Sequence, residues 1–212
     1  MWPETEQTQE LLLGVAADDS EAVNRLMNRH RNAVRDMIAL RMDRRMQGRV
    51  DASDIVQDVL IEAAGRLKDY LRDPAMPFHL WLRQIAKDRM IDLHRRHHAQ
   101  RRSVDREQEM AVGGNDDRSS FNMVARLQDA GITPAAAAIK QELEQRFWSA
   151  VDQLDDPDRE MILMRHAEQL GNGEAAVALG LSPAAAGMRY LRAIRRLRTL
   201  LGVELADDPE SL

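Results

Sequence analysis

The chain has 212 residues, which allows one ordinary domain or two small ones. It contains no cysteine, which excludes disulfide bonds, thiolate zinc sites and a cysteine nucleophile. Its apolar runs are too short to span a bilayer and no basic leader precedes them, so we expect a cytoplasmic protein. The formal net charge of −5 disfavours nucleic acid as a partner, but acids and bases lie in separate blocks, and local charge steers partners.

The composition predicts an all-α protein. Alanine, leucine, methionine and arginine, which are good helix formers, are abundant, and aromatic residues make up only 4% of the chain. Residues 1–19 form an acidic N-terminal segment, and residues 1–24 hold six acids and no base. A helical pattern then begins with Asp18 as its expected N-cap, and it opens a first helical domain at residues 20–106.

A second helix is expected to begin near Asp51. On one of its faces Asp54, Asp58 and Glu62 recur at four-residue steps. Three carboxylates in a row could bind a metal, but no helix with a Glu-x-x-His motif accompanies them. The pattern leaves two interpretations open, a solvated acidic face and a surface for a partner protein.

A third helix is expected to start at Phe78, after two dipeptides that contain proline. The first turns of this helix are apolar on nearly all sides, and its later part is basic. Residues 83–106 hold eight basic and three acidic residues. The spacing of His94, His97 and His98 could suit a metal. No carboxylate or cysteine completes a ligand set there, and the neighbouring arginines repel cations, so a helix end that lies on phosphates fits better.

Residues 107–133 are rich in glycine, asparagine, aspartate and serine, which predicts a flexible linker. A second helical domain is expected at residues 134–202, where Thr133 caps the first helix and Pro134 occupies its first turn. An acidic tail, residues 203–212, holds four acids and no base.

The last two expected helices of this domain form a helix-turn-helix pattern. A short helix over residues 174–179 is followed by a turn, and Ser182 then caps a helix that runs to about Leu201. Residues 187–201 hold five arginines and no acid. In a DNA-binding helix-turn-helix the second helix enters the major groove. Two helices joined by a short turn can also occur without any DNA binding, and this alternative stays open at this point.

No motif for catalysis stands out in the sequence. It contains no glycine-rich phosphate loop and no local Ser, His and Asp constellation. We therefore expect no enzymatic activity, no cofactor and no metal.

Four segments match motifs that one protein family carries in the same order. Residues 51–58 (DASDIVQD) resemble D-x-x-D-[LIV]-V-Q-[DE], and residues 78–86 (FHLWLRQIA) resemble F-x-x-W-L-x-x-I-A. Residues 154–165 (LDDPDREMILMR) resemble L-P-x-x-x-R-x-V-x-L-L-R, and residues 174–193 resemble the helix-turn-helix of the same family. Together these segments resemble the sigma factors of bacterial RNA polymerase of the extracytoplasmic-function type, in which the first motif is the polymerase-docking helix. The spacing around Arg95 and the residues after it also resembles sigma factors of the planctomycete type.

The resemblance implies a sigma region 2-like domain that docks on core RNA polymerase and opens the minus-ten element. It also implies a sigma region 4-like domain that binds the minus-thirty-five element and the polymerase flap. Promoter DNA and the polymerase are the implied partners, and an anti-sigma or other regulatory protein is left open as a further one. The implied polymerase contacts are Asp54, Ile55, Val56, Gln57, Asp58 and Glu62. The implied DNA contacts are Lys87, Asp88, Arg89, Arg95, Arg96, Arg101, Arg102, Ser182, Arg189, Arg192 and Arg196.

Two positions depart from the family's pattern. Asp88 stands where many relatives carry asparagine, and a carboxylate can accept a hydrogen bond from a cytosine or adenine amino group. Residues 185–187 (AAG) stand where relatives often have T-V-K, so contact with upstream DNA would rest on Arg189 and Arg192.

Two other classes of protein stay open from the sequence. One is a helix-turn-helix transcriptional regulator that is not a polymerase subunit. The other is an α-helical metal protein or enzyme that uses His94, His97 and His98.

Overall fold

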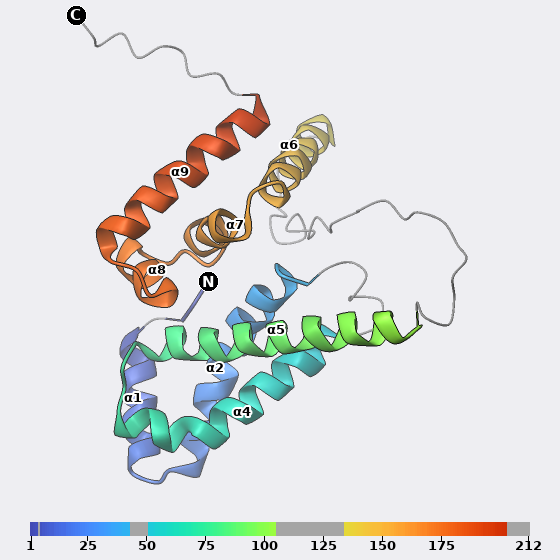
Figure 1. Ribbon diagram of the computed structural model, residues 1–212. Helices are drawn as coiled ribbons and strands as arrows, with labels where there is room; N and C mark the ends of the chain where they lie inside the picture. Colours follow the sequence, from blue (N-terminus) through green and yellow to red (C-terminus); the bar gives the residue numbers. More distant parts are fainter. Residues whose placement is uncertain (4, 43–50, 105–133, 203–212) are drawn as a thin grey trace, which may run out of the picture. The chain divides into compact units, whose positions relative to one another are not determined.

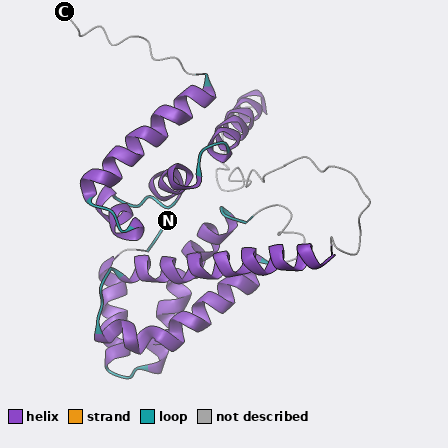
Figure 2. Ribbon diagram, in the orientation of Figure 1, coloured by secondary structure: helices purple, strands orange, loops and turns teal. Residues whose placement is uncertain are grey.

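The computed structural model describes residues 1–3, 5–42, 51–104 and 134–202, with the backbone alone described for 96–104 and 134–138 (Figure 1). The described residues form helices, loops and turns and no strand (Figure 2), which confirms the all-α prediction. The chain divides into two compact units, Met1–Ser119 and Ser120–Leu212. The predicted linker at 107–133 and the acidic tail lie outside the described residues.

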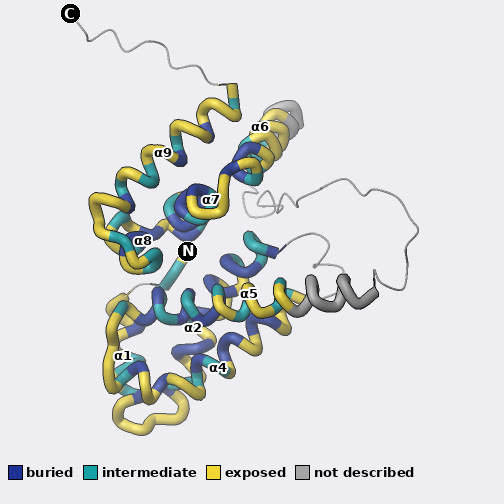
Figure 3. The backbone as a smooth tube through the Cα atoms, viewed as in Figure 1, coloured by how far each residue is buried: buried dark blue, intermediate teal, exposed yellow. Residues whose placement is uncertain are grey.

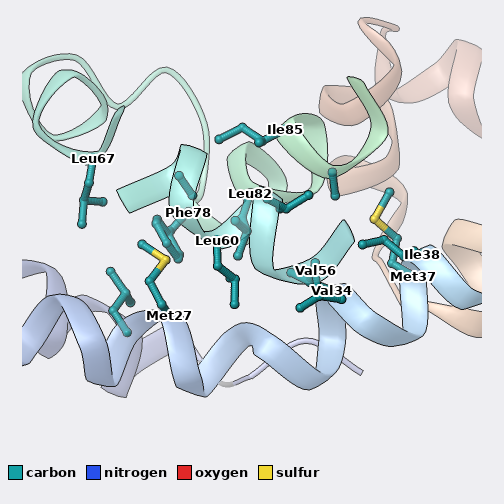
Figure 4. Packing of buried hydrophobic residues seen from close by; sticks show 14 of the residues in the cluster. Met27, Val34, Met37, Ile38, Val56, Leu60, Leu67, Phe78, Leu82 and Ile85 are labelled. Atoms are coloured by element: carbon teal, nitrogen blue, oxygen red, sulfur yellow. The ribbon is translucent and has the colours of Figure 1, made fainter. Parts of the chain in front are cut away.

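The first unit is a helical bundle around one apolar core. Its helix α2 packs against α1, α4 and α5, and α4 packs against α5. Leucine, isoleucine, valine and methionine side chains from these helices interdigitate with Phe78 (Figure 4). The buried side chains of each long helix lie on the face that turns toward the other helices. The helices are α1 (Thr5–Ala16), α2 (Ser20–Ala39), α4 (Ala52–Arg72) and α5 (Phe78–Val104).

Aspartate side chains cap two of these helices. The Asp51 carboxylate accepts a hydrogen bond from the Ser53 N–H at 2.8 Å and starts α4, as predicted. The cap of α2 is Asp19, which accepts from the Glu21 N–H at 2.8 Å, and not Asp18 as predicted. Asp18 has a φ of 61°, a left-handed conformation in the turn after α1, whereas an N-cap has an extended backbone.

The N-terminal residues are more than an acidic segment, because residues 5–16 form α1, a helix that packs on α2. Thr8 and Val15 are buried, and a Cβ atom at Gly14 would lie 3.0 Å from the Ala22 Cβ, so the close approach of α1 and α2 leaves little room for a side chain at this position. The Thr8 hydroxyl and His30 Nε2 share a hydrogen bond of 3.2 Å in the core. The sequence analysis placed the start of the first helical domain at residue 20. The folded part of the first unit begins earlier, with α1 at Thr5.

The burial of His30 predicts a pH dependence of stability. Burial, together with the positive charge of Arg29, lowers the pKa of His30 to about 4 from 6.5. A histidine with a depressed native pKa stays neutral in the fold while the unfolded chain takes up a proton, so stability falls as the pH drops from 6.5 towards 4. We expect His30 to account for a loss of about 3 kcal/mol over this interval.

Urea unfolding of the full chain between pH 7 and 4 measures this loss. His30→Gln cannot ionise but can still bond to Thr8, so it provides the comparison. The free energy of unfolding should fall less steeply with pH in the variant. Parallel pH profiles would show that the ring takes up a proton as readily in the fold as in the unfolded chain.

The second unit is a smaller bundle built around its last helix. Helix α9 packs against α6, α7 and α8, and the core includes Val151, Ile162 and Leu197. The elements are α6 (Pro134–Asp152), α7 (Asp156–Ile162), the π-helical turn η2 (Leu163–Ala167), α8 (Asn172–Leu179) and α9 (Pro183–Leu201).

Arg159 closes the corner between α6 and α7. Its guanidinium donates to the backbone carbonyls of Asp152 at 2.8 Å and Leu154 at 3.3 Å. The last carbonyls of a helix have no partner within the helix, so the arginine satisfies groups that would otherwise be unpaired. This contact gives a physical reason for the arginine in the motif of residues 154–165.

Candidate polymerase and nucleic-acid interfaces

Helix α4 turns its acidic face to solvent. Asp54, Gln57 and Asp58 are exposed. Ile55 and Val56, which the resemblance placed among the polymerase contacts, are instead only 4% and 2% exposed and belong to the core. Both side chains pack in the core and help to hold α4 in place. Contact of these two residues with the polymerase stays a prediction.

One apolar residue of this face was missed from the sequence. The Ile61 side chain is 62% exposed, between the exposed Asp58 and the half-buried Glu62. Glu62 pairs with Arg66 at 3.0 Å within the same helix. The spacing of Ile61 from Gln57 and Asp58 could have identified it, because residues three and four apart share a helix face. We define the docking face as Asp54, Gln57, Asp58, Ile61 and Glu62.

An ion pair joins the docking face to α5. The Arg89 guanidinium donates to an Asp58 carboxylate oxygen at 2.6 Å, and this hydrogen bond raises the pKa of Arg89. The resemblance placed these two residues in different interfaces, polymerase and DNA. Of their neighbours, Lys87 is half-buried, and the exposed Asp88 accepts a hydrogen bond from Gln84 at 3.1 Å.

The basic segment of the first unit continues α5 without a break to Val104. Arg95 is exposed and lies 4.0 Å from Asp92. Arg96, Arg101 and Arg102 lie on the same helix, but their side chains are outside the described residues, as are those of His97 and His98. Within the described part, no group of three His, Cys, Asp or Glu side chains could hold a metal.

Helices α8 and α9 form the predicted helix-turn-helix. Gly180 ends α8 with a φ of 63°, the left-handed conformation that glycine adopts readily. The Ser182 hydroxyl oxygen accepts from the Ala185 N–H at 3.2 Å and starts α9, as the sequence predicted for its cap. The Asn172 amide donates to the Pro183 carbonyl at 2.9 Å and ties the start of α8 to the start of α9.

The arginines of α9 differ in their surroundings. Arg192 and Arg195 are exposed, and Arg189 is half-buried. Tyr190, between them, holds the helix against η2, because its hydroxyl shares a 3.0 Å hydrogen bond with His166 and its ring lies 5.3 Å from the Arg165 guanidinium. The helix is thus fixed on one side and presents arginines on the other.

Arg196 forms ion pairs with two aspartates of its own unit. Its guanidinium donates to Asp155 at 2.5 Å and to Asp158 at 2.6 Å, and the Asp158 side chain is only 3% exposed. The backbone N–H of Asp158 and then the Arg196 guanidinium lower the pKa of the Asp155 carboxyl. DNA contact by Arg196 stays a prediction, and these two carboxylates compete with it.

Loss of Arg196 should therefore lower stability more than loss of its neighbour. Arg196→Gln leaves a buried carboxylate without its cation, which is costly, and we expect the melting temperature of the full chain to fall by roughly 5 °C or more. Arg195→Gln removes the same charge from an exposed position and should leave the melting temperature nearly unchanged. Equal melting curves for both variants would contradict a structural role of Arg196.

The fold and these surfaces define a class, an all-helical protein with an exposed acidic helix face in one unit and a helix-turn-helix in the other. Residues 26–100 match Sigma-70 region 2, and residues 144–197 match Sigma-70, region 4. The chain belongs to the sigma-70 family of RNA polymerase sigma factors, of the extracytoplasmic-function type, as the resemblance implied. The planctomycete subgroup stays a prediction.

Two curated relatives are sigma factors. The RNA polymerase sigma factor CnrH of Cupriavidus metallidurans is 32% identical over 160 residues, which cover 73% of this chain and 75% of CnrH. The RNA polymerase sigma factor NccH of Alcaligenes xylosoxydans xylosoxydans is 30% identical over 156 residues, which cover 71% of this chain and 73% of NccH.

Solved structures show the same fold. CnrH in complex with the cytosolic domain of CnrY matches with a TM-score of 0.60 and 25% identity, over 93% of this chain and 98% of that one. The sigma factor RpoE in complex with the anti-sigma factor NepR, from Bartonella quintana, matches with a TM-score of 0.51 and 20% identity, over 95% and 99%. None of the described helices here is long and apolar enough to cross a membrane.

Proposed function

We propose that this sigma factor binds core RNA polymerase through the docking face of α4 and upstream promoter DNA through α9. The observation that carries the proposal is the presence, in one chain, of an exposed acidic helix face and a helix-turn-helix whose second helix has no acid. Family membership makes the chain a promoter-specificity subunit of the polymerase, and the chemistry of RNA synthesis belongs to the polymerase itself. Its place of action is accordingly the bacterial cytoplasm.

The docking face is supported by exposure and charge together. Asp54, Gln57 and Asp58 project from buried neighbours on a helix that the core fixes, so their spacing is preorganised. An exposed isoleucine among carboxylates suits a protein partner that offers an apolar patch surrounded by lysine or arginine side chains. A helix-turn-helix regulator needs no such surface, which favours the sigma factor over that alternative.

The DNA contacts divide between the two units. Arg189 and Arg192 lie on the helix that a helix-turn-helix places in the major groove, so they are proposed to read bases or phosphates. Arg95 and, by sequence, Arg96, Arg101 and Arg102 continue a helix whose front is buried, and phosphate contact is proposed for them.

A protein regulator is a further proposed partner. Between α6 and α9 lies an open apolar pocket of about 710 Å³. It is lined in part by Ile139, Leu143 and Phe147, and the first two are 60% and 58% exposed. The similar structures of CnrH and RpoE are complexes with other proteins, which supports a regulator that binds this chain as well.

Reconstitution with core RNA polymerase tests the proposed function. The purified chain should form a stoichiometric complex with core polymerase in the absence of DNA. The complex should start transcription at a limited set of genomic sites, and mapping of the RNA 5′ ends identifies them. A chain that binds DNA but not core polymerase would instead be a regulator of the helix-turn-helix class.

A further inference from the structure

The N-terminal half of α9 has an exposed surface without hydrogen-bonding side chains. Residues 183–188 are PAAAGM, so no polar side chain lies between Ser182 and Arg189. Ala184 and Ala185 are exposed, and Met188 is 61% exposed. One turn further, Leu191 is 50% exposed.

These side chains share the face of α9 that points away from the core. At 100° per residue, Ala184, Met188 and Leu191 fall within one narrow stripe, and Arg195 continues it. Ala186, Ala193 and Leu197 lie on the opposite face and are 0%, 0% and 4% exposed. Figure 3 shows the outer side of α9 exposed along its length. The outward stripe is thus apolar in its first half and basic in its second.

Charge indicates what covers this stripe. Helix α9 carries five arginines and no acid, and two of the arginines, Arg192 and Arg195, are exposed beside the apolar half. A phosphate backbone complements such a helix. In a helix-turn-helix the N-terminal residues of the second helix then meet base edges, and here these residues are Ala184, Ala185 and Met188.

Base edges differ in how well they suit an apolar surface. In the major groove adenine, guanine and cytosine present only donors or acceptors, whereas thymine also presents its C5-methyl group. When an alanine or methionine side chain covers the methyl group, the burial of apolar surface makes the binding free energy more favourable. When it covers an amino or carbonyl group that keeps no hydrogen-bond partner, the binding free energy becomes less favourable.

We propose that α9 recognises thymine in the upstream promoter element through the C5-methyl group, with Ala184, Ala185 and Met188 as the contacting side chains. This inference rests on the proposed placement of α9 in the major groove. It assigns the preference for thymine to apolar contact at the helix start, and it leaves the proposed contacts of Arg189 and Arg192 with bases or phosphates unchanged.

Uracil tests the proposal, because it differs from thymine only by lacking the methyl group. Holoenzyme made from the full chain first selects upstream sequences from a randomised promoter library. Each selected thymine is then replaced by deoxyuridine, one position at a time. We expect at least one position where the replacement weakens holoenzyme binding by about fourfold, the value of one buried methyl group.

A side-chain variant locates the contact. Met188→Ala should abolish the difference between thymine and uracil at one position, and alanine preserves the helix. Leu200→Ala is the matched control, because Leu200 is a 41% exposed apolar residue at the other end of α9. It should retain the full difference.

Two results would overturn the inference. If thymine and uracil bind equally at every upstream position, α9 does not read methyl groups, although salt-sensitive binding that needs Arg192 would still uphold the proposed function. If Met188→Ala weakens binding to core polymerase without DNA and leaves the thymine preference intact, the stripe contacts protein. Failure of the holoenzyme to bind upstream DNA at all would overturn the inference and the DNA part of the proposed function together.

Discussion

Asp54→Arg is expected to weaken binding of the full chain to core RNA polymerase by about 100-fold or more. Asp54 is exposed at the start of the docking face, so the substitution places a cation where a basic partner surface is expected, and like charges in an interface cost several kcal/mol. The fold should persist, because Asp51 and not Asp54 caps α4. Fluorescence titration of labelled core polymerase, with circular dichroism to check helix content, measures both effects.

Asp69→Arg is the matched control for this substitution. Asp69 is an exposed acid on the same helix, beyond the docking face and near the C-terminal end of α4, where a cation is favourable. The affinity of the Asp69→Arg variant for core polymerase should stay close to that of the unchanged chain. If the Asp54 and Asp69 variants bind alike, the acidic face of α4 is a solvated surface.

Asp58 needs a different design, because it also pairs with Arg89. Asp58→Arg alone would remove this ion pair and also reverse a charge of the docking face. The double variant Asp58→Arg with Arg89→Asp restores an ion pair between α4 and α5 but reverses the charge at the docking face. We expect it to regain thermal stability and still to bind polymerase weakly. Recovery of binding would show that only the intramolecular pair matters.

Arg192→Ala is expected to change which upstream sequences the holoenzyme prefers. Loss of an arginine that bonds to a guanine costs about 1–3 kcal/mol, or roughly 5- to 150-fold in affinity, and relaxes the preference at one base position. Binding of the holoenzyme to a promoter library at several salt concentrations measures both the preference and the salt dependence.

The corresponding substitutions in the first unit should act differently. Arg95→Ala and Arg96→Ala are expected to weaken binding evenly across sequences and to lower the salt slope by about one unit, as for lost phosphate contacts. Strand opening should become slower while upstream preference stays unchanged. Identical library profiles for the Arg192 variant and the unchanged chain would mean that Arg192 supplies only charge.

Local signals explain why the sequence alone predicted most of the fold. Asp51 and Ser182 cap helices by hydrogen bonds to residues two and three positions away, and Gly180 ends a helix through its own backbone conformation. Apolar periodicity shows which helix face turns inward. The helix-turn-helix and the two helical units depend on such signals, and the family motifs added the docking helix and its expected partner.

The tertiary structure decided the details of the sites. It left Ile61 exposed in the docking face and made residues 5–16 a packed helix. It also joined Asp58 to Arg89, 31 positions apart, and Arg196 to Asp158, 38 positions apart. Sequence patterns do not distinguish an arginine that binds DNA from one that binds a distant carboxylate, because that distinction depends on which helices meet in space.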